Sequence, residues 1–147
     1  MADMDYVVQF KKLRPDAIIP TKGTSNAAGW DLYAVEDTFI TGGMGVVAVP
    51  TGIAVQVPEG TYGRIAMRSG MALNGHFAVS AGVIDRDYTG EIKVLVYCMR
   101  NCGPVPIGKG QRFAQLILEK VSYAPCVEVE EFARKFNSHD GFGSTGS

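Results

Sequence analysis

Short runs of apolar residues, each bounded by glycine, proline or polar turn residues, recur along the whole chain. Several runs alternate apolar and polar positions, which is the period of a half-buried β-strand. In Cys126–Phe132, Val127 and Val129 fall on one face and Glu128 and Glu130 on the other. The runs predict strands at residues 6–10, 31–35, 46–49, 52–57, 63–67, 77–84, 92–99, 113–121 and 126–132.

The spacing of these runs favours an all-β sandwich or barrel, because turn signals recur every 8–12 residues or so and no strand–helix–strand rhythm appears. One short helix, of one or two turns, is expected near Ser69–Leu73. From Ala133 onward core-type residues are few, so we expect a flexible C-terminal tail. The predicted organisation is a β-barrel domain at 1–132 followed by a flexible glycine-rich segment at 133–147.

Charge and composition limit the partners of the chain. The 147 residues include 14 Lys and Arg against 15 Asp and Glu, a formal net charge of -1. Proteins that follow nucleic-acid phosphates are normally basic, so a nucleic-acid polymer is not an expected partner, whereas a small anion needs only a few local donors. The first residues lack the basic region of a secretion signal, and no apolar run has the length of a membrane span. We therefore expect a soluble intracellular protein of the cytoplasm or nucleus, neither secreted nor bound to a membrane.

The cysteines and two glycine-rich stretches suggest chemistry that the pattern does not support. Three cysteines without a CxxC pair favour thiols in a reducing compartment over disulfides or a metal site. Gly103–Gly110 matches GxxxxGK, but Gly110 replaces the required Ser or Thr, and Pro104 and Pro106 remove two amides, so a turn is predicted. The tail GFGSTG matches GxGxxG, yet a Rossmann fold is excluded because no βαβ unit surrounds it.

Two stretches place polar groups among glycines at predicted strand ends. In AAGWDLYA, the lone acid Asp31 either caps a turn before the strand or lies in the strand, paired or functional. In GRIAMRSGMA, Arg68, Ser69 and Gly70 offer a guanidinium, a hydroxyl and an unobstructed amide in succession. These groups suit phosphate oxygens, and the alternative is a plain helix cap beside an exposed arginine.

A third stretch, AGVIDRDYTGEIKVLVY, predicts a β-hairpin with Gly82 and Gly90 at its corners. Asp85 follows core-type residues, and partial burial there would suit a general base for water. Asp87 is expected in the turn, in contact with solvent. The ring of Tyr88 has a position suited to packing against a sugar, and the alternative is an ordinary hairpin with acidic turn residues.

These stretches resemble, in order, the five motifs of the trimeric deoxyuridine triphosphate nucleotidohydrolases (dUTPases). AAGWDLYA is similar to motif one, with Trp30 where Tyr is usual, and GRIAMRSGMA to motif two, with Met67 in place of Pro. The hairpin stretch is similar to motif three. GQRFAQLILEK is similar to motif four, with Gln111 in place of Asp, and GFGSTG is identical to motif five.

The resemblance implies a jelly-roll-like β-barrel subunit, the β-clip fold of that family, and a homotrimer whose active sites are shared between subunits. The implied reaction is the magnesium-dependent hydrolysis of dUTP to dUMP and pyrophosphate, which supplies dUMP for dTMP synthesis and keeps uracil out of DNA. The glycine-rich tail would close as a lid over a nucleotide held at a neighbouring pair of subunits.

The resemblance also implies roles for individual residues. Asp85 would orient and deprotonate the water that attacks the α-phosphorus, and Asp31 would meet magnesium through water. Uracil and deoxyribose would contact Gly82, Val83, Ile84, Tyr88, Lys93 and Phe142. The phosphates would contact Arg68, Ser69, Gly70, Gln115, Arg134, Gly143, Ser144 and Thr145.

One departure from the family pattern concerns the γ-phosphate. The family usually has an arginine five residues before the motif-five phenylalanine, and Asn137 occupies that position here. Either the tail has a three-residue insertion and Arg134 reaches the phosphate, or the grip on it is weaker. Two other readings of the chain are a dUTP-binding regulatory homologue with little turnover and a dCTP deaminase on the same fold.

Overall fold

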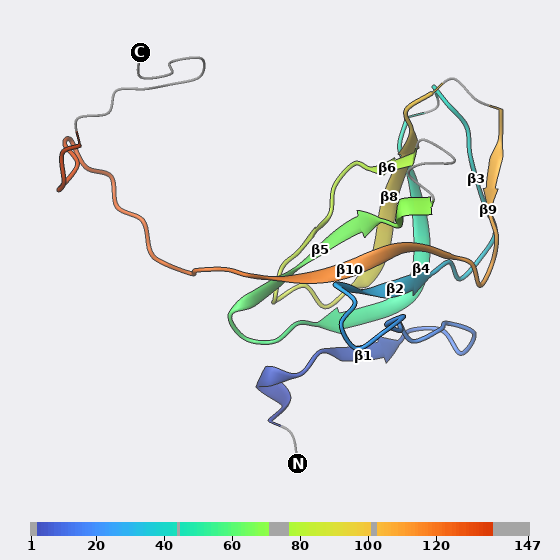
Figure 1. The fold of residues 1–147 in the computed structure, drawn as a ribbon, viewed down its shortest axis with the longest axis horizontal. Coiled ribbons are helices and arrows are strands. Elements are labelled where there is room, and N and C mark those ends of the chain that lie inside the picture. Colours follow the sequence, from blue (N-terminus) through green and yellow to red (C-terminus); the bar gives the residue numbers. More distant parts are fainter. Residues whose placement is uncertain (1–2, 44, 71–76, 101–102, 137–147) are drawn as a thin grey trace.

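The computed structural model describes residues 3–43, 45–70, 77–100 and 103–136. Apart from one 3-10 turn at Met4–Tyr6 (η1) and helical geometry at Ser69 and Gly70, these residues form strands joined by loops (Figure 1). The strands are β1 Gln9–Lys12, β2 Gly29–Tyr33, β3 Thr38–Ile40, β4 Val47–Gln56, β5 Thr61–Met67, β6 Phe77–Val79, β7 Val83–Ile84, β8 Glu91–Cys98, β9 Val105–Ile107 and β10 Arg112–Lys120.

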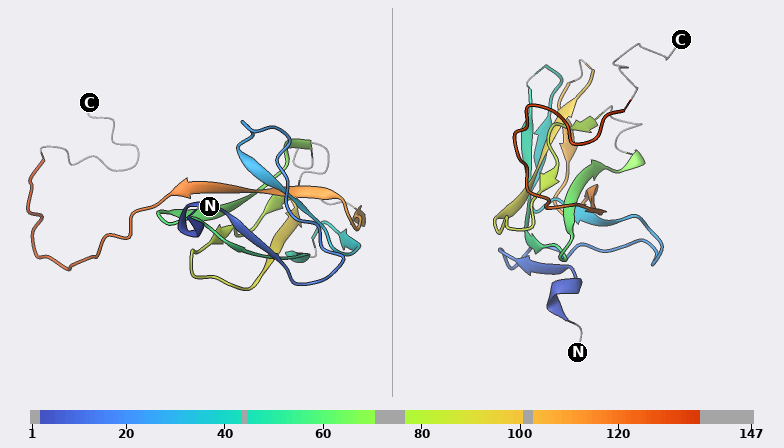
Figure 2. Two further views of the ribbon diagram at one scale, coloured as in Figure 1. Left: turned by 90° about the horizontal axis from the view of Figure 1, so that it is seen from below. Right: turned by 90° about the vertical axis from the view of Figure 1, so that its left-hand side faces the viewer.

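All strand pairs are antiparallel and form two four-stranded sheets and one two-stranded sheet. The strand orders are β1-β4-β8-β6, β2-β10-β5-β7 and β3-β9. One apolar core joins the three sheets, which Figures 1 and 2 show packed together, because strands of each sheet contribute buried residues, among them Val49 of β4, Leu116 of β10 and Ile107 of β9. In β8, for example, Ile92, Val94 and Val96 are buried while Lys93 lies on the other face.

The predicted all-β class is confirmed, and the arrangement is jelly-roll-like. The expected barrel is not closed, because each four-stranded sheet ends in edge strands. Of the expected helix, Ser69 and Gly70 have helical geometry, and the following residues 71–76 lie outside the described part of the chain.

Two strand predictions and one turn prediction differ from the structure in an informative way. The runs at 46–49 and 52–57 form one strand, β4, with an irregularity between them. The single run at 77–84 is divided between β6 and β7, which belong to different sheets. The predicted turn at 103–110 contains the short strand β9.

The segment that follows β10 leaves the sheets. β10 ends at Lys120, and residues 121–136 run outward without a strand (Figures 1 and 2). The strand predicted at 126–132 is therefore wrong for this chain, since Val127 is 81% and Phe132 82% exposed. Alternation alone does not form a strand when no neighbouring edge supplies the hydrogen bonds. The proposed domain boundary at residue 132 stays a prediction.

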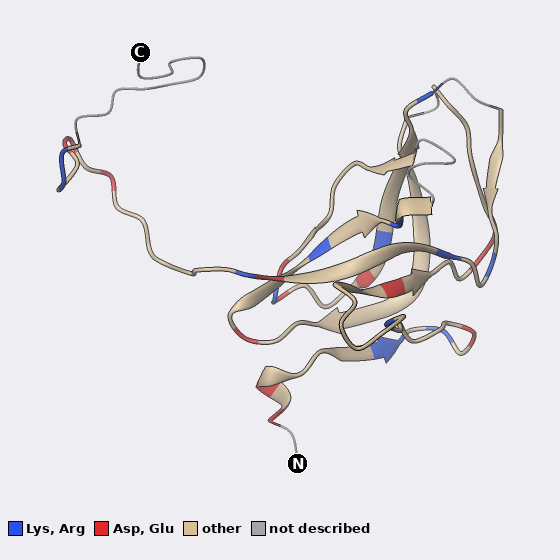
Figure 3. Ribbon diagram, viewed as in Figure 1, with Lys and Arg blue, Asp and Glu red and all other residues tan. Residues whose placement is uncertain are grey.

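Charged residues are interspersed along the ribbon (Figure 3). Blue and red segments alternate over several strands rather than forming one continuous basic face. Within the described ranges, no helix has both the length and the apolar character that crossing a membrane requires.

Candidate active site

The predicted β-hairpin is not a paired one, because β7 finds its antiparallel partner in β5 whereas β8 pairs with β4 and β6, so the two strands belong to different sheets. Residues 81–95, which contain β7, the turn after it and the start of β8, connect the two sheets and are called the hairpin below. They enclose a small cavity. The turn is closed by a hydrogen bond from the Tyr88 amide to the Asp85 carbonyl, 3.1 Å. The cavity has a volume of about 220 Å³ and is lined by Ile65, Ala81, Gly82, Val83, Ile84, Asp85, Tyr88, Glu91, Lys93 and Leu95. It brings together every hairpin residue that the sequence assigned to the nucleoside, together with the predicted general base.

Hydrogen bonding of β7 determines which backbone groups face this cavity. β7 is the edge strand of its sheet and pairs with β5, where Val83 lies opposite Arg64 and Ile84 opposite Gly63. The Ile65 amide donates to the Gly82 carbonyl at 2.7 Å, so Gly82 directs its carbonyl toward β5. Because successive residues of a strand direct their amides and carbonyls to opposite edges, those of Val83 point away from β5.

Gly82 allows this close approach of the two strands. A Cβ atom built at Gly82 would lie 2.8 Å from the Ile65 carbonyl oxygen, a distance that real Cβ atoms do not adopt. A side chain at this position would push β7 away from β5 and change the width of the cavity.

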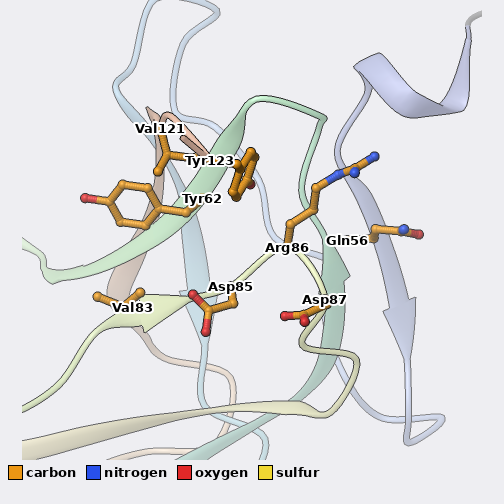
Figure 4. Close-up of a pocket in the computed structure, with 8 residues that line it drawn as sticks. All are labelled: Gln56, Tyr62, Val83, Asp85, Arg86, Asp87, Val121 and Tyr123. Carbon is orange, nitrogen blue, oxygen red and sulfur yellow. The ribbon is translucent and has the colours of Figure 1, made fainter. Parts of the chain in front are cut away.

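A second, larger cavity of about 770 Å³ adjoins the hairpin, and Val83 and Asp85 line both cavities. Figure 4 shows Asp85 and Asp87 on the hairpin, with the rings of Tyr62 and Tyr123 on the other side of this cavity. Asp85 is exposed in the single chain, which differs from the partial burial considered in the sequence analysis. The carboxylate of Asp85 thus has access to both spaces, and Asp87 is exposed as expected.

Asp31 lies at the centre of an ion-pair cluster. It is in β2 rather than in a turn before it, so the turn-cap alternative is wrong. Its side chain is 15% exposed, and its carboxylate oxygens lie 3.5 Å from Arg68 Nε and 3.6 Å from Arg112 Nη1. Arg112 was missed as a candidate residue, although a basic residue at the start of the motif-four strand could have indicated it.

The other predicted phosphate-binding residues that precede the C-terminal tail lie beside this ion-pair cluster. Gln115 is opposite Asp31 in the β2–β10 register, and its side-chain amide donates to the Met67 carbonyl at 3.4 Å. Ser69 and Gly70 are exposed just after β5, and a Cβ atom at Gly70 would meet nothing within 4 Å. The ends of β2, β5 and β10 therefore gather the guanidinium, hydroxyl, amide and carboxamide groups that the sequence assigned to phosphate.

The residues predicted to bind phosphate that precede the C-terminal tail, together with the ion pairs of Asp31, are called the phosphate cluster below. The phosphate cluster and the hairpin lie at opposite ends of β5. Asp85 comes one residue after Ile84, the partner of Gly63, and shares a cavity with Tyr62. Arg68 is six positions beyond Tyr62 in the sequence, and at 3.3 Å per residue the separation along the strand is about 20 Å. The sheet order also places Asp31, the ion-pair partner of Arg68, on the side of β5 away from β7.

The motif departures have clear structural settings. Gln111 is exposed, and its Oε1 accepts a hydrogen bond from the Gly108 amide at 2.9 Å. Met67 is the last residue of β5. The ring of Trp30 packs edge-on against Phe10, with the ammonium of Lys22 4.3 Å from its centroid.

The predicted tail residues Phe142, Gly143, Ser144 and Thr145, and Asn137 with them, lie outside the described residues. Arg134 is described and is exposed in the segment after β10. The Nζ atom of the neighbouring Lys135 lies 3.6 Å from Oε2 of Glu131, which comes four residues earlier in the sequence.

The donor set near Asp31 does not form a metal site by itself. Among the described residues, no group of three or more His, Cys, Asp or Glu side chains is arranged to hold an ion. Magnesium, however, keeps several waters and binds through one or two carboxylates together with substrate phosphates. A single carboxylate beside phosphate-binding groups fits a magnesium ion that is held mainly by a bound triphosphate.

A second network of hydrogen bonds joins β5 to β10. Glu119 of β10 accepts hydrogen bonds from the Tyr62 hydroxyl and from Arg64 Nε, the latter at 2.6 Å. These bonds, Tyr62 first and Arg64 second, hold the pKa of Glu119 below its ordinary value of 4.5, and the same contact with Glu119 raises the pKa of Tyr62.

Comparison with known proteins agrees with this geometry. The family model of dUTPase matches residues 15–146. The chain is 46% identical over 143 residues to a probable deoxyuridine 5'-triphosphate nucleotidohydrolase of Schizosaccharomyces pombe, covering 97% of this chain and 99% of that protein. It is also 46% identical over 147 residues to the corresponding enzyme of Saccharomyces cerevisiae, covering 99% of each. The structure of the dUTPase of Staphylococcus bacteriophage 80alpha with dUPNHPP matches it with a TM-score of 0.83 at 25% identity, covering 96% of this chain and 99% of the phage chain. The chain belongs to the dUTPase family.

Proposed function

We propose that the protein is a dUTP diphosphatase, which hydrolyses dUTP to dUMP and pyrophosphate. The observation that carries this proposal is the hairpin cavity, because the residues predicted to bind the nucleoside line the same small space as Asp85. The relatives from both yeasts, at 46% identity over nearly the whole chain, support the same activity.

The backbone of Val83 would read the base. Its carbonyl and amide face away from β5, which offers one acceptor and one donor side by side at the cavity. Uracil presents an N3–H donor next to a carbonyl acceptor, so the two patterns match. Cytosine presents an unprotonated N3 at the same place, and its lone pair would face the Val83 carbonyl. A cavity of this kind therefore favours uracil over cytosine.

Asp85 would act as the general base. It lies beside the nucleoside cavity, where its carboxylate can accept the proton of a water molecule that attacks the α-phosphorus. The new bond joins the water oxygen to the α-phosphorus, and the bond from that phosphorus to the bridging oxygen of the β-phosphate breaks. Pyrophosphate leaves with the bonding electron pair, and the proton passes to Asp85. The ring of Tyr88 would lie under the deoxyribose and exclude a 2'-hydroxyl.

A complete site would need more than one subunit, which supports the proposed homotrimer. Along β5 the phosphate cluster lies about 20 Å from Asp85, farther than the α- and γ-phosphates of one nucleotide are apart. Arg68 pairs with Asp31 of β2, which lies on the side of β5 away from β7. Its guanidinium is therefore directed away from the hairpin of its own chain. We therefore propose that Arg68, Ser69, Gly70 and Gln115 of one subunit bind the phosphates of a nucleotide seated in the hairpin of another, near the larger cavity.

The remaining groups would complete the site. Magnesium would arrive with the triphosphate, meet Asp31 through water, and neutralise charge that develops on the phosphates. The tail residues Phe142–Thr145 would close over the nucleotide, with Arg134 near the γ-phosphate. We propose the cytoplasm or nucleus as the setting.

The test is an assay of the full-length protein with dUTP or dCTP and magnesium, in which pyrophosphate and ammonia are both measured. We expect pyrophosphate from dUTP alone. Asp85→Asn should keep the fold and the affinity for dUTP and lower kcat about 10²- to 10⁴-fold, because the proton acceptor is lost. Asp87→Asn, on the exposed turn of the same hairpin, is the matched control and should remain active.

Each other outcome contradicts a part of the proposal. Ammonia from dCTP would indicate a deaminase, and tight dUTP binding without product would indicate a regulatory binding protein. Near-normal turnover by Asp85→Asn would remove Asp85 from the mechanism.

A further inference from the structure

A bulge in β4 lies directly behind the hairpin. Pro50 pairs with Lys93 and Ala54 with Glu91, so the three residues between Pro50 and Ala54 face the single residue Ile92. Gly52, in the middle of the bulge, has φ 68°. A Cβ atom there would lie 3.0 Å from the Cβ atom of Ala17, so both the backbone angle and the packing require glycine.

Two side-chain hydrogen bonds fasten the start of β8 to this bulge. The hydroxyl of Thr51, which is 1% exposed, donates to the Ile92 carbonyl at 2.7 Å and accepts from the Ile53 amide at 3.2 Å. The carboxylate of Glu91 accepts from the Gly52 amide at 3.0 Å. Buried hydrogen bonds of this kind are costly to break, so the backbone of the first two residues of β8 is fixed in position.

The backbone of Glu91 in turn holds the ring of Tyr88. The Tyr88 hydroxyl donates to the Glu91 carbonyl at 2.7 Å. Gly90 makes room for the ring, because a Cβ atom there would lie 2.8 Å from the hydroxyl oxygen and 3.0 Å from Cζ. Tyr88 and Glu91 both line the hairpin cavity.

We propose that Glu91 is a positioning residue for sugar discrimination, acting through Tyr88. This inference rests on the proposed function, in which the Tyr88 ring excludes a ribose. The carboxylate is engaged by the Gly52 amide, and the carbonyl of the same residue anchors the ring. A ring fixed at its hydroxyl resists displacement by a 2'-hydroxyl, whereas a ring free to tilt gives way. The bulge of β4 therefore sets how strictly the enzyme rejects UTP.

The test is a double-mutant cycle on the full-length protein, with the ratio of kcat/KM for dUTP to kcat/KM for UTP as readout. Glu91→Ala should lower this ratio about threefold to tenfold, the range expected for one hydrogen bond. Glu91→Gln should keep most of it, because the amide oxygen still accepts from Gly52. Tyr88→Phe should lower the ratio similarly, and adding Glu91→Ala to Tyr88→Phe should lower it no further.

Controls separate this inference from a general loss of stability. Glu59→Ala, at an exposed glutamate in the turn between β4 and β5, should leave the ratio unchanged. Gly90→Ala, which crowds the ring directly, should lower the ratio with Glu91 intact. If Glu91→Ala does not fold, Glu91→Asp replaces it, since the shorter side chain does not reach the Gly52 amide from the same backbone position.

The possible failures are distinguishable. A Glu91 variant with a lower Tm but an unchanged ratio overturns the positioning role and leaves the diphosphatase proposal intact. Additive effects of Glu91→Ala and Tyr88→Phe overturn the route through Tyr88. An unchanged ratio in Tyr88→Ala means that the sugar is read elsewhere, and absence of dUTP hydrolysis by the unmodified protein overturns the proposed function itself.

Discussion

The hairpin and the phosphate cluster are built in opposite ways. The hairpin is complete within one chain: one continuous stretch of sequence, residues 81–95, supplies all of its cavity wall except Ile65. The phosphate cluster is assembled from the ends of three strands, β2, β5 and β10, and is held by ion pairs of Asp31 with Arg68 and Arg112. In the proposed function, the first recognises a nucleoside by local backbone shape, and the second binds phosphates by charge.

This difference teaches that local and assembled groups serve different purposes. Base and sugar recognition needs fixed distances, and a short hairpin clamped to its neighbouring strands supplies them. Phosphate recognition needs a matching charge and some freedom to adjust, and a half-buried cluster of two arginines on one carboxylate supplies these. The distance between the two groups along β5 is the reason that we propose a site divided between subunits.

The largest effect that tests this comparison is complementation between two inactive variants. Asp85→Asn and Arg68→Ala should each be nearly inactive. After unfolding and refolding together in equal amounts, the whole population should regain roughly a quarter of the unmodified activity, because each of the two contributions is intact at half of the sites. The measurement is pyrophosphate release, with mixed trimers verified by native mass spectrometry.

The opposite result is equally clear. If one chain supplied both residues to a site, no site in any mixture would be intact, and activity would stay at the weighted sum of the two parents. A mixture of Asp85→Asn with Asp85→Ala is the control, since its trimers contain no intact Asp85.

A smaller effect concerns Arg134, the residue after β10 that we propose lies near the γ-phosphate. Arg134→Ala should lower kcat/KM for dUTP about tenfold and leave that for dUDP nearly unchanged, because only the γ-phosphate contact is lost. Lys135→Ala is the matched control, since Lys135 already pairs with Glu131. A larger loss in Lys135→Ala than in Arg134→Ala would show that Arg134 does not replace the arginine that the family usually has at the position of Asn137.

The smallest effect should come from the network that joins the strands between the two groups. Because the pKa of Glu119 is lowered in the folded protein, its contribution to stability is present above about pH 4.5 and is lost as the pH falls through the folded-state pKa. Glu119→Gln removes that contribution, so its Tm should fall less steeply than that of the unmodified protein between about pH 5 and pH 3.

Thermal unfolding monitored by circular dichroism across this range is the measurement. Glu128→Gln, at an exposed position after β10, is the control. Parallel Tm curves of Glu119→Gln and the unmodified protein would mean that the carboxylate gains nothing from Tyr62 and Arg64.

The sequence predicted the residues of the hairpin better than its pairing, and the assembled cluster poorly. The hairpin is one short stretch, so the motif resemblance gathered Asp85, Tyr88 and Lys93, which do line one cavity, but the pairing of β7 with β5 rather than β8 depends on the whole fold. The pairing of Asp31 with Arg112 depends on which strands are neighbours, and no local pattern contains that information. The same limit explains the strand wrongly predicted at 126–132: its alternation is real, but no edge within this chain pairs with it.

The bulge in β4 was not predictable for another reason. The run VVAVPTGIAVQV reads as two strands separated by a turn, because proline and glycine usually end a strand. In the structure the strand continues, since Gly52 adopts a positive φ and Thr51 satisfies the freed backbone groups of Ile53 and Ile92. The contacts of Thr51 with Ile92 distinguish this bulge from a turn, and they are not visible in the local sequence.

The length of β5 has a consequence for working with the enzyme at low concentration. If one chain holds the base at one end of this strand and the phosphates of a different nucleotide at the other, as we propose, a dissociated subunit has only two half-sites. Specific activity should therefore decline on dilution below the assembly dissociation constant, and saturating substrate should delay the decline, since a nucleotide that bridges two chains favours the assembled state by mass action. In a dilute assay, the protein then behaves as an enzyme whose own substrate assembles it.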